Sequence, residues 1–167
     1  MLVSQLIKST LDLQGFRVSQ VQGDTNKLIM NILPDRRQLL FCSSCGSASK
    51  YRDTLPVRHF RHVPLWGIPV WLRYRPRRVR CEHCGIKVEH FPWSTGKHRF
   101  TNAFAHFLGA WARFLPWKHV AQLFDCSWGT VASAVDHMVE YGLAHRDLSD
   151  LTHIGIDEIS REKARCI

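Results

Sequence analysis

Residues 73–85 read RYRPRRVRCEHCG, and the interpretation of this 167-residue chain begins there. A basic, strand-like run leads directly into two cysteines with two residues between them. A second pair with the same spacing, CSSCG, lies upstream at residues 42–46. Two such pairs are typical of one tetrahedral zinc site, because each tight turn directs two thiolates at the same ion.

The two pairs predict a structural zinc ion with four thiolate ligands, which are Cys42, Cys45, Cys81 and Cys84. The gap between the pairs, residues 46–80, is longer than in a minimal zinc ribbon and has room for further strands. A metal crosslink would anchor a segment that is too short and too charged to fold by itself. The alternatives are four buried free cysteines or a redox-active thiol pair.

The formal net charge of +9 is concentrated in one part of the sequence. Residues 36–99 contain fourteen Lys and Arg but three acidic residues, whereas the rest of the chain contains nine basic and eleven acidic residues. Such a local excess indicates a polyanionic partner, and nucleic acid is the commonest one. We expect the partner to be double-stranded DNA. An acidic protein or a membrane surface is the alternative.

Five arginines in this basic segment are the predicted contacts to the DNA backbone: Arg73, Arg75, Arg77, Arg78 and Arg80. Their planar guanidinium groups suit phosphate oxygens better than lysine ammonium groups do. Contacts of this kind supply affinity but carry no sequence information. The alternative is a solvated strand face with scattered charges.

The pattern of elements predicts an α+β fold with four parts. Residues 1–37 are expected to form an N-terminal helix and a β-hairpin, and residues 38–95 a zinc-binding β-rich domain in which Val70, Leu72 and Tyr74 alternate with exposed residues. Three helices follow in residues 98–142, with Thr101 and Ser127 as N-caps and Gly142 as the C-terminal stop. Residues 153–167 contain one more strand.

Residues 117–138, WKHVAQLFDCSWGTVASAVDHM, have the spacing of a helix-turn-helix. Asp125 occupies a turn position where glycine is frequent, and Trp128 is interpreted as a core residue. The second helix would enter the major groove, and its predicted DNA contacts are Ser127, Thr130, Ser133 and His137. A plain helical hairpin packed in a core has the same spacing and is the alternative.

The sequence contains no apolar run of the roughly 20 residues that a membrane helix needs. Its N-terminus lacks the basic region and the cleavage site of a secretory signal. We therefore expect a cytoplasmic protein without a membrane partner. A reducing compartment disfavours structural disulfides and agrees with a metal site for the paired cysteines.

Taken together, five motifs resemble the ISL3 family of bacterial insertion-sequence transposases: FCSSCG (41–46), RRVRCEHCG (77–85), FPW (91–93), SWGTV (127–131) and HIGIDEIS (153–160). The resemblance implies a zinc-binding region and a helix-turn-helix that together bind the terminal inverted repeats of the element. It also implies a DDE catalytic domain with an RNase H-like fold and Mg ions. By match to the motif GIDE, Asp157 would be the first catalytic carboxylate.

Ten residues follow Asp157, and they do not continue as the second strand of the family's catalytic sheet. Two-metal chemistry needs several converging carboxylates, so we expect a truncated, catalytically inactive chain whose strand at 153–160 is an orphan of the missing domain. Its expected partners are the inverted repeats and, as a possibility, a second copy or the full-length transposase. The alternatives are a fragment of an active DDE transposase and a basic protein-interaction module.

Overall fold

The computed structural model describes residues 13–35, 37–147 and 149 of the chain. Within these ranges it contains two sheets and three helices, so the predicted α+β class is confirmed. The elements are β1 (Phe16–Gly23), β2 (Leu28–Pro34), β3 (Lys50–Thr54), β4 (Arg58–Leu65), β5 (Ile68–Tyr74), β6 (Arg77–Cys81), β7 (Gly85–Val88), α2 (Asn102–Ala112), α3 (Trp117–Leu123) and α4 (Trp128–Ala144). The predicted N-terminal helix and the strand at 153–160 lie outside the described residues.

The larger sheet has four strands in the order β1-β2-β5-β4. β1 and β2 form the predicted hairpin, and its turn is closed by Asp24, whose carboxylate accepts hydrogen bonds from the backbone N–H groups of Asn26 and Lys27. β2 pairs with β5 in parallel, and the other pairs are antiparallel. The N-terminal hairpin is therefore part of the same sheet as the β4–β5 hairpin.

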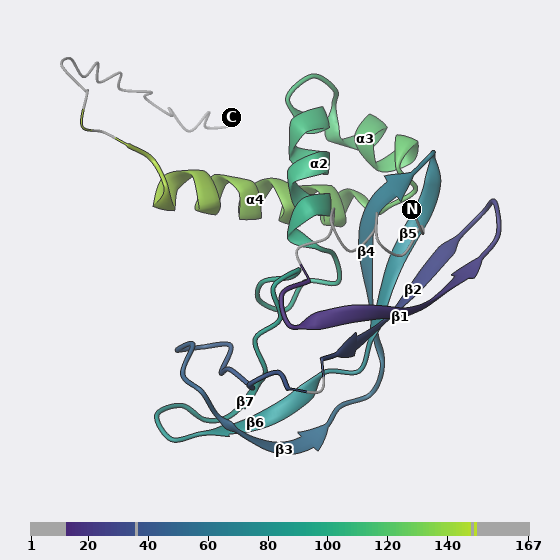
Figure 1. The fold of residues 1–167 in the computed structure, drawn as a ribbon. Coiled ribbons are helices and arrows are strands. Elements are labelled where there is room, and N and C mark those ends of the chain that lie inside the picture. The colour runs from purple at the N-terminus through teal and green to yellow at the C-terminus, as the bar shows by residue number, and fades with distance from the viewer. Residues whose placement is uncertain (1–12, 36, 148, 150–167) are drawn as a thin grey trace, which may run out of the picture.

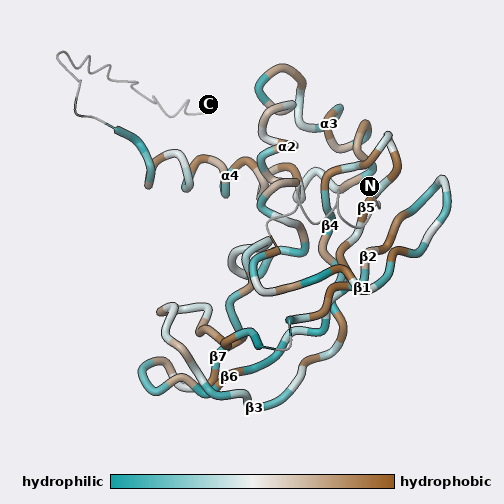
Figure 2. Tube along the Cα trace, in the orientation of Figure 1, coloured by the Kyte–Doolittle hydropathy of each residue, from teal (hydrophilic) through white to brown (hydrophobic). Residues whose placement is uncertain are grey.

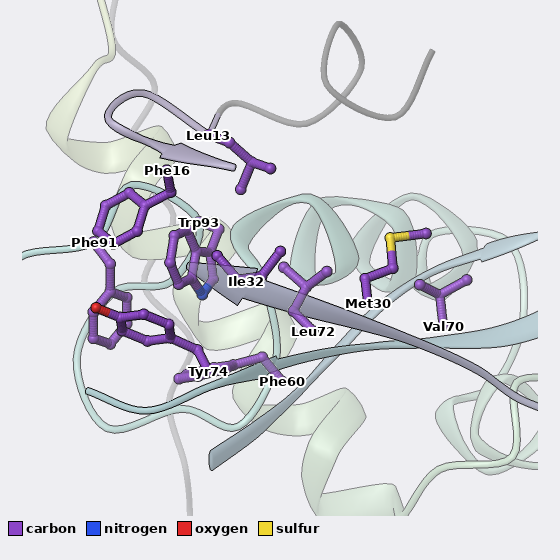
Figure 3. Close-up of a cluster of buried hydrophobic side chains, with 10 residues drawn as sticks. All are labelled: Leu13, Phe16, Met30, Ile32, Phe60, Val70, Leu72, Tyr74, Phe91 and Trp93. Atoms are coloured by element: carbon purple, nitrogen blue, oxygen red, sulfur yellow. The ribbon is translucent and has the colours of Figure 1, made fainter. Parts of the chain in front are cut away.

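One face of this sheet carries the main hydrophobic core. Val70, Leu72 and Tyr74 point inward from β5, whereas Arg73 is exposed, which confirms the predicted alternation. Aromatic rings from outside the sheet complete the core, as Figure 3 shows. The buried residues are Leu13, Phe16, Met30, Ile32, Phe60, Val70, Leu72, Tyr74, Phe91 and Trp93. The rings of Phe16 and Trp93 meet edge to face with their centroids 4.7 Å apart.

The smaller sheet has the order β3-β6-β7 and contains both cysteine pairs at its border. Its buried cluster consists of Val79 and the zinc-motif cysteines Cys42 and Cys81, with Leu40 and Cys84 packed against them. Such a small apolar cluster cannot offset the entropy of ordering three strands. The smaller sheet therefore depends on a crosslink for its stability.

The three helices pack around a separate core of Phe100, Phe104, Ala105, Leu108, Val120, Ala121, Val131 and Ala134. Both predicted N-caps are confirmed. The hydroxyl of Thr101 accepts a hydrogen bond from the backbone N–H of Phe104, and that of Ser127 accepts one from Thr130. Each cap satisfies an amide that the helix itself leaves without a partner.

The turn between α3 and α4 depends on Asp125, which has a φ of +47°. The N–H of Cys126 donates to the carbonyl of Ala121 at 2.9 Å, and the N–H of Asp125 donates to that of Gln122 at 3.4 Å. This is the hydrogen-bond pattern of a Schellman motif, whose left-handed position is usually glycine. Asp125 therefore occupies the glycine-like position that the sequence indicated, and it adopts the same backbone conformation.

Arg61 joins the larger sheet to the helices. Its side chain is 5% exposed, lies between the rings of Trp71 and Phe104, and donates from Nη2 to the carbonyl of Phe124 at 3.0 Å. Phe124 is the C-cap of α3, so the bond reaches the turn between α3 and α4. The position of this turn is thereby fixed relative to β4.

Figure 1 shows the helices at one end of the molecule, the smaller sheet at the other, and the four-stranded sheet between them. Hydrophobic and hydrophilic residues alternate along most elements, and residues 145–147, directly after α4, are hydrophilic (Figure 2). The predicted domain boundary between residues 37 and 38 does not separate the two sheets. β1 and β2, which precede it, belong to the same sheet as β5, which follows it. The predicted domain boundaries stay a proposal.

Two predictions about α4 are wrong. The helix does not stop at Gly142 but continues to Ala144, where His145 caps it by donating its N–H to the carbonyl of Tyr141. Trp128 is not a core residue: its side chain is 58% exposed and lies against the ring of Trp117. Trp128 is the first residue of α4. The residues of this helix that pack into the core begin one turn later, with Val131 and Ala134.

Replacing Gly142 with Ala should stabilise the protein by roughly 0.5–1 kcal/mol, because Gly142 lies inside a helix and an added Cβ would meet nothing within 4 Å. Gly109→Ala is the matched control. Its added Cβ would lie 2.9 Å from Cγ of Met138, so it should destabilise. Urea unfolding of both variants checks the two signs, and a destabilised Gly142→Ala variant would contradict the helical assignment.

Candidate zinc centre and nucleic-acid interface

The sulfur atoms of Cys42, Cys45, Cys81 and Cys84 lie within 4.8 Å of one another. Sγ of Cys45 and Sγ of Cys81 lie 3.5 Å apart. A tetrahedral zinc ion with Zn–S bonds of about 2.3 Å would hold its sulfurs roughly 3.8 Å apart. Both the donor set and its dimensions therefore fit zinc.

The backbone turns that follow the second cysteine of each pair need glycine. Gly46 and Gly85 both have a φ of +70°, and an added Cβ would meet nothing within 4 Å at either residue. Glycine is therefore required for backbone conformation and not for space. In the first turn, the N–H of Ser44 donates to Sγ of Cys42 at 3.4 Å, as expected for an amide that stabilises a thiolate ligand.

The crowded thiols affect one another's ionisation. Hydrogen bonds from the side chain and the backbone of Ser47 lower the pKa of Cys45 to about 6. The hydrogen bond with Cys45, together with burial, raises the pKa of Cys84 to about 12. Four adjacent thiolates repel one another unless a cation lies between them, and a coordinated metal ion deprotonates its thiol ligands. The cluster is thus suited to a divalent metal ion.

Zinc held by these four cysteines is structural, because four thiolates close a tetrahedral coordination and leave no position for a substrate. The ion links the turn at residues 42–46 to the hairpin of β6 and β7, where Cys81 pairs with Gly85. Cys42 also forms an isolated bridge with Glu89, which follows β7. The centre therefore holds the smaller sheet together.

Two of the five predicted DNA-contacting arginines are engaged inside the protein. Arg77 pairs with the buried carboxylate of Glu89 through Nε at 2.8 Å, and its backbone N–H donates to the same group at 2.7 Å. Arg78 donates from Nε and Nη2 to Asp53 at 2.6 Å, and these hydrogen bonds hold the pKa of Asp53 below its ordinary value. The side chain of Arg77 is 18% exposed, whereas that of Arg78 is 40% exposed although Asp53 occupies its guanidinium group. The predicted DNA contacts of both arginines stay predictions.

The acidic partners of these arginines were missed by the sequence analysis. Glu89 and Asp53 are two of the three acidic residues in the basic segment. The small number of acidic residues there could have indicated that they form ion pairs. A lone acid among many arginines is expected to pair with one of them. Which arginine it selects depends on strand pairing, and β6 lies between β3 and β7, which places Arg77 and Arg78 beside the two acids.

The remaining three arginines are exposed, but they do not form one ribbon. Arg73 and Arg75 lie at the end of the larger sheet and line a hollow of about 360 Å³ beside the polar side chains of Gln22 and Asn31. Arg80 lies on β6 of the smaller sheet. The buried Pro76 separates the two sets.

The four predicted contacts on the helices lie along one side of α4. Ser127 is exposed at the N-cap, and its hydroxyl also bonds to that of Thr130 at 2.9 Å. Thr130, Ser133 and His137 are half-buried. The ring of His137 lies 5.9 Å from that of His98, which belongs to the loop before α2. The DNA contact of His137 stays a prediction.

The exposed surface of α4 differs from that of a basic recognition helix. The helix has no Lys or Arg from Trp128 to Ala144, and Asp136 and Glu140 are exposed on it. Residues 128–135 at its start and 141–144 at its end lack an acidic side chain, and Trp128 and Gly129 are exposed in the first turn. The spacing of Trp128 matches the apolar stripe of α4, so its position at the surface was not predicted.

Asp157 lies outside the described residues, so the structure does not test its predicted catalytic role. Among the residues that are described, none of the helices has the length and apolar character to cross a membrane.

Residues 39–84 match a family model described as the zinc-finger of transposase IS204/IS1001/IS1096/IS1165. The match includes all four cysteines and the segment 73–80 that carries the three exposed arginines. It confirms the resemblance to ISL3-family transposases for this segment and supports a structural zinc ion at the cysteine cluster. No curated protein and no solved structure gives a significant match to the chain.

Removing zinc should unfold the smaller sheet and leave α2 and α4 intact, because the binding free energy of the metal supplies the stability that the small apolar cluster lacks. Cys81→Ser should bind no zinc, whereas Cys126→Ser should keep one zinc per chain, since Cys126 belongs to the helical core. Metal analysis and amide chemical shifts check both variants. A chain whose β6 and β7 signals persist in strong chelator would contradict this dependence.

Replacing Glu89 with Gln should destabilise the protein by roughly 3 kcal/mol, because it leaves the charge of Arg77 in a half-buried position without its counter-ion. Asp53→Asn breaks an ion pair of similar geometry whose side chains are about 40% exposed, so its effect on the melting temperature should be small. Thermal unfolding of both variants measures the difference. Equal losses would show that the Arg77–Glu89 pair has no special role.

Proposed function

We propose that this chain is the DNA-binding part of an ISL3-like transposase and that it recognises the terminal inverted repeats of the element in the bacterial cytoplasm. The observation that carries the proposal is the four-cysteine centre within a concentrated basic segment that matches a transposase zinc finger. A closed metal site has no catalytic position of its own, so its contribution is to fix the surrounding side chains in place.

Affinity in this proposal comes from Arg73, Arg75 and Arg80. All three are exposed, and none forms an ion pair with a residue that the structure describes. The sheets hold the backbone of these arginines, so no segment of main chain has to be ordered when their guanidinium groups meet phosphate oxygens. Arg77 and Arg78 support this surface indirectly, because their pairing with Glu89 and Asp53 holds the strand between Arg75 and Arg80.

Sequence preference in this proposal comes from the start of α4. The turn at Asp125 and the close contact of the buried Ala121 are what a helix-turn-helix requires. Asp136 and Glu140 would repel phosphates, so only the first turns of α4 would approach the major groove. Ser133 and Trp128 are then the residues best placed to reach base edges, while Ser127 and Thr130 fix the helix start.

Catalysis by this chain is a separate question. DDE chemistry needs several carboxylates that converge on two metal ions, and Asp157 is the one candidate that the resemblance indicated. Because Asp157 lies outside the described residues, the expectation of a catalytically inactive chain stays a prediction. Association with a second copy or with full-length transposase likewise remains a proposal.

Replacing Arg73 and Arg75 together with Ala should weaken binding to every duplex alike and reduce the slope of log K against log salt by about 2, one unit for each lost phosphate contact. Arg113→Ala, which removes a charge at the end of α2, is the control and should change the slope less. Ser133→Ala should instead alter the ranking of duplex sequences. Fluorescence anisotropy at several salt concentrations measures all three variants.

The proposed function would be contradicted if the wild-type chain with its zinc bound no duplex at physiological salt. Binding to an acidic protein that survives this salt, without binding to DNA, would favour a protein-interaction module instead.

A further inference from the structure

We infer that a second site for the sugar–phosphate backbone of DNA lies in a groove between the zinc turn and the loop that leads to α2. The inference rests on the proposed function and assigns DNA contact to residues outside the arginine strand. The groove has a volume of about 590 Å³, and its principal polar residues are Ser43, Ser44, Arg58, Lys87, Lys97 and Arg99. We call it the knuckle groove.

The knuckle groove is positively charged. Four basic side chains line it, from β4, β7 and the loop at residues 94–99. Glu89 also lies in its wall, but that carboxylate is 2% exposed and is neutralised by Arg77 while it accepts a further hydrogen bond from Tyr74 at 2.6 Å. The field within the groove therefore attracts anions.

Hydroxyl groups lie among these charges. Ser43 and Ser44 form the part of the wall between the zinc ligands Cys42 and Cys45. Within the described ranges of the chain, neither serine hydroxyl has a hydrogen-bond partner, so both are available to phosphate oxygens. Serine hydroxyls and basic side chains together are the usual donors to a nucleic-acid backbone.

The opposite wall is rigid. The N–H of Asn102 donates to the carbonyl of Trp93 at 2.8 Å, and the side chain of Asn102 accepts from the N–H of Thr95 at 3.1 Å. The hydroxyl of Ser94 donates to the carbonyl of Phe100 at 2.9 Å, and the carbonyl of Arg99 accepts from Arg61. A loop held at so many points fixes the backbone of Lys97 and Arg99 and avoids the entropy cost of ordering the loop on binding.

The position of the groove favours duplex DNA as its occupant over a small anion. It lies where the smaller sheet meets the loop to α2, so one phosphate strand along it would lead from the zinc turn towards the helices (Figure 1). Its volume is much larger than one phosphate group, and its charges come from both walls. A backbone segment of several phosphates satisfies such a surface, whereas a single anion does not.

The groove also depends on the metal. The N–H of Ser43 donates to the carbonyl of Val88 at 3.2 Å, which joins the zinc turn to the end of β7 beside Lys87. Loss of zinc would release both the turn and β7, and one wall of the groove with them. The zinc site would therefore be coupled to DNA affinity through the residues between its own ligands.

The test uses the full chain with zinc, a mixed-sequence duplex and anisotropy at several salt concentrations. Lys87→Ala combined with Lys97→Ala should reduce the salt slope by about 2. Ser43→Ala combined with Ser44→Ala should weaken binding roughly tenfold with an unchanged slope, because it removes two hydrogen bonds and no charge. Lys50→Ala is a single-charge control: it removes one lysine charge from β3, at the opposite edge of the same sheet, and should change the slope by less than the double lysine variant does.

Zinc content and circular dichroism confirm that each variant is folded. The inference is overturned if the Lys87, Lys97 double variant and the double serine variant both bind as the wild type does. If, in that outcome, the wild type binds duplex DNA and loses this binding when Arg73 and Arg75 are replaced, the proposed function still stands. A wild-type chain without duplex binding would overturn both.

Discussion

The carboxylate of Glu89 lies where the two sheets meet and accepts hydrogen bonds from both of them. Tyr74, at the end of β5, belongs to the main core, while Arg77 begins β6 of the smaller sheet. The main chain of Glu89 also forms a β-bridge with that of Cys42, a zinc ligand. Through its carboxylate and its backbone, one buried residue thus connects the core, the basic strand and the metal centre, and the orientation of the smaller sheet depends on it.

This arrangement explains why the basic segment is less uniform than its composition suggests. Some arginines stabilise the fold, as Arg61 does between Trp71 and Phe104 and as Arg77 does beside Glu89. Others are exposed at the surface, where they are available to a polyanion. The net charge of a sequence counts the arginines that stabilise the fold together with those that are exposed. Burial and ion pairing in the structure distinguish the two kinds.

Local patterns predicted most of what is local. The cysteine pairs, the first hairpin, the alternation in β5 and the caps at Thr101 and Ser127 each depend on residues close together in the sequence, and the structure contains all of them. The parallel pairing of β2 with β5 and the partners of Arg77 and Arg78 depend on contacts between distant segments, which no local pattern specifies. The predictions for Trp128 and Gly142 were wrong because packing and capping set the ends of a helix, and hydrophobic periodicity does not report either of them.

The contact of Arg61 with the α3–α4 turn fixes the distance between the larger sheet and the start of α4. Because Phe124 is bonded to β4, the start of α4 and the arginines of the sheet keep a constant separation and angle. A DNA duplex repeats every 10 to 10.5 base pairs, so on DNA held by both parts this separation corresponds to one helical phase. Inserting about half a turn of base pairs between the two contacted stretches would place them on opposite sides of the duplex, beyond the reach of a single rigid chain.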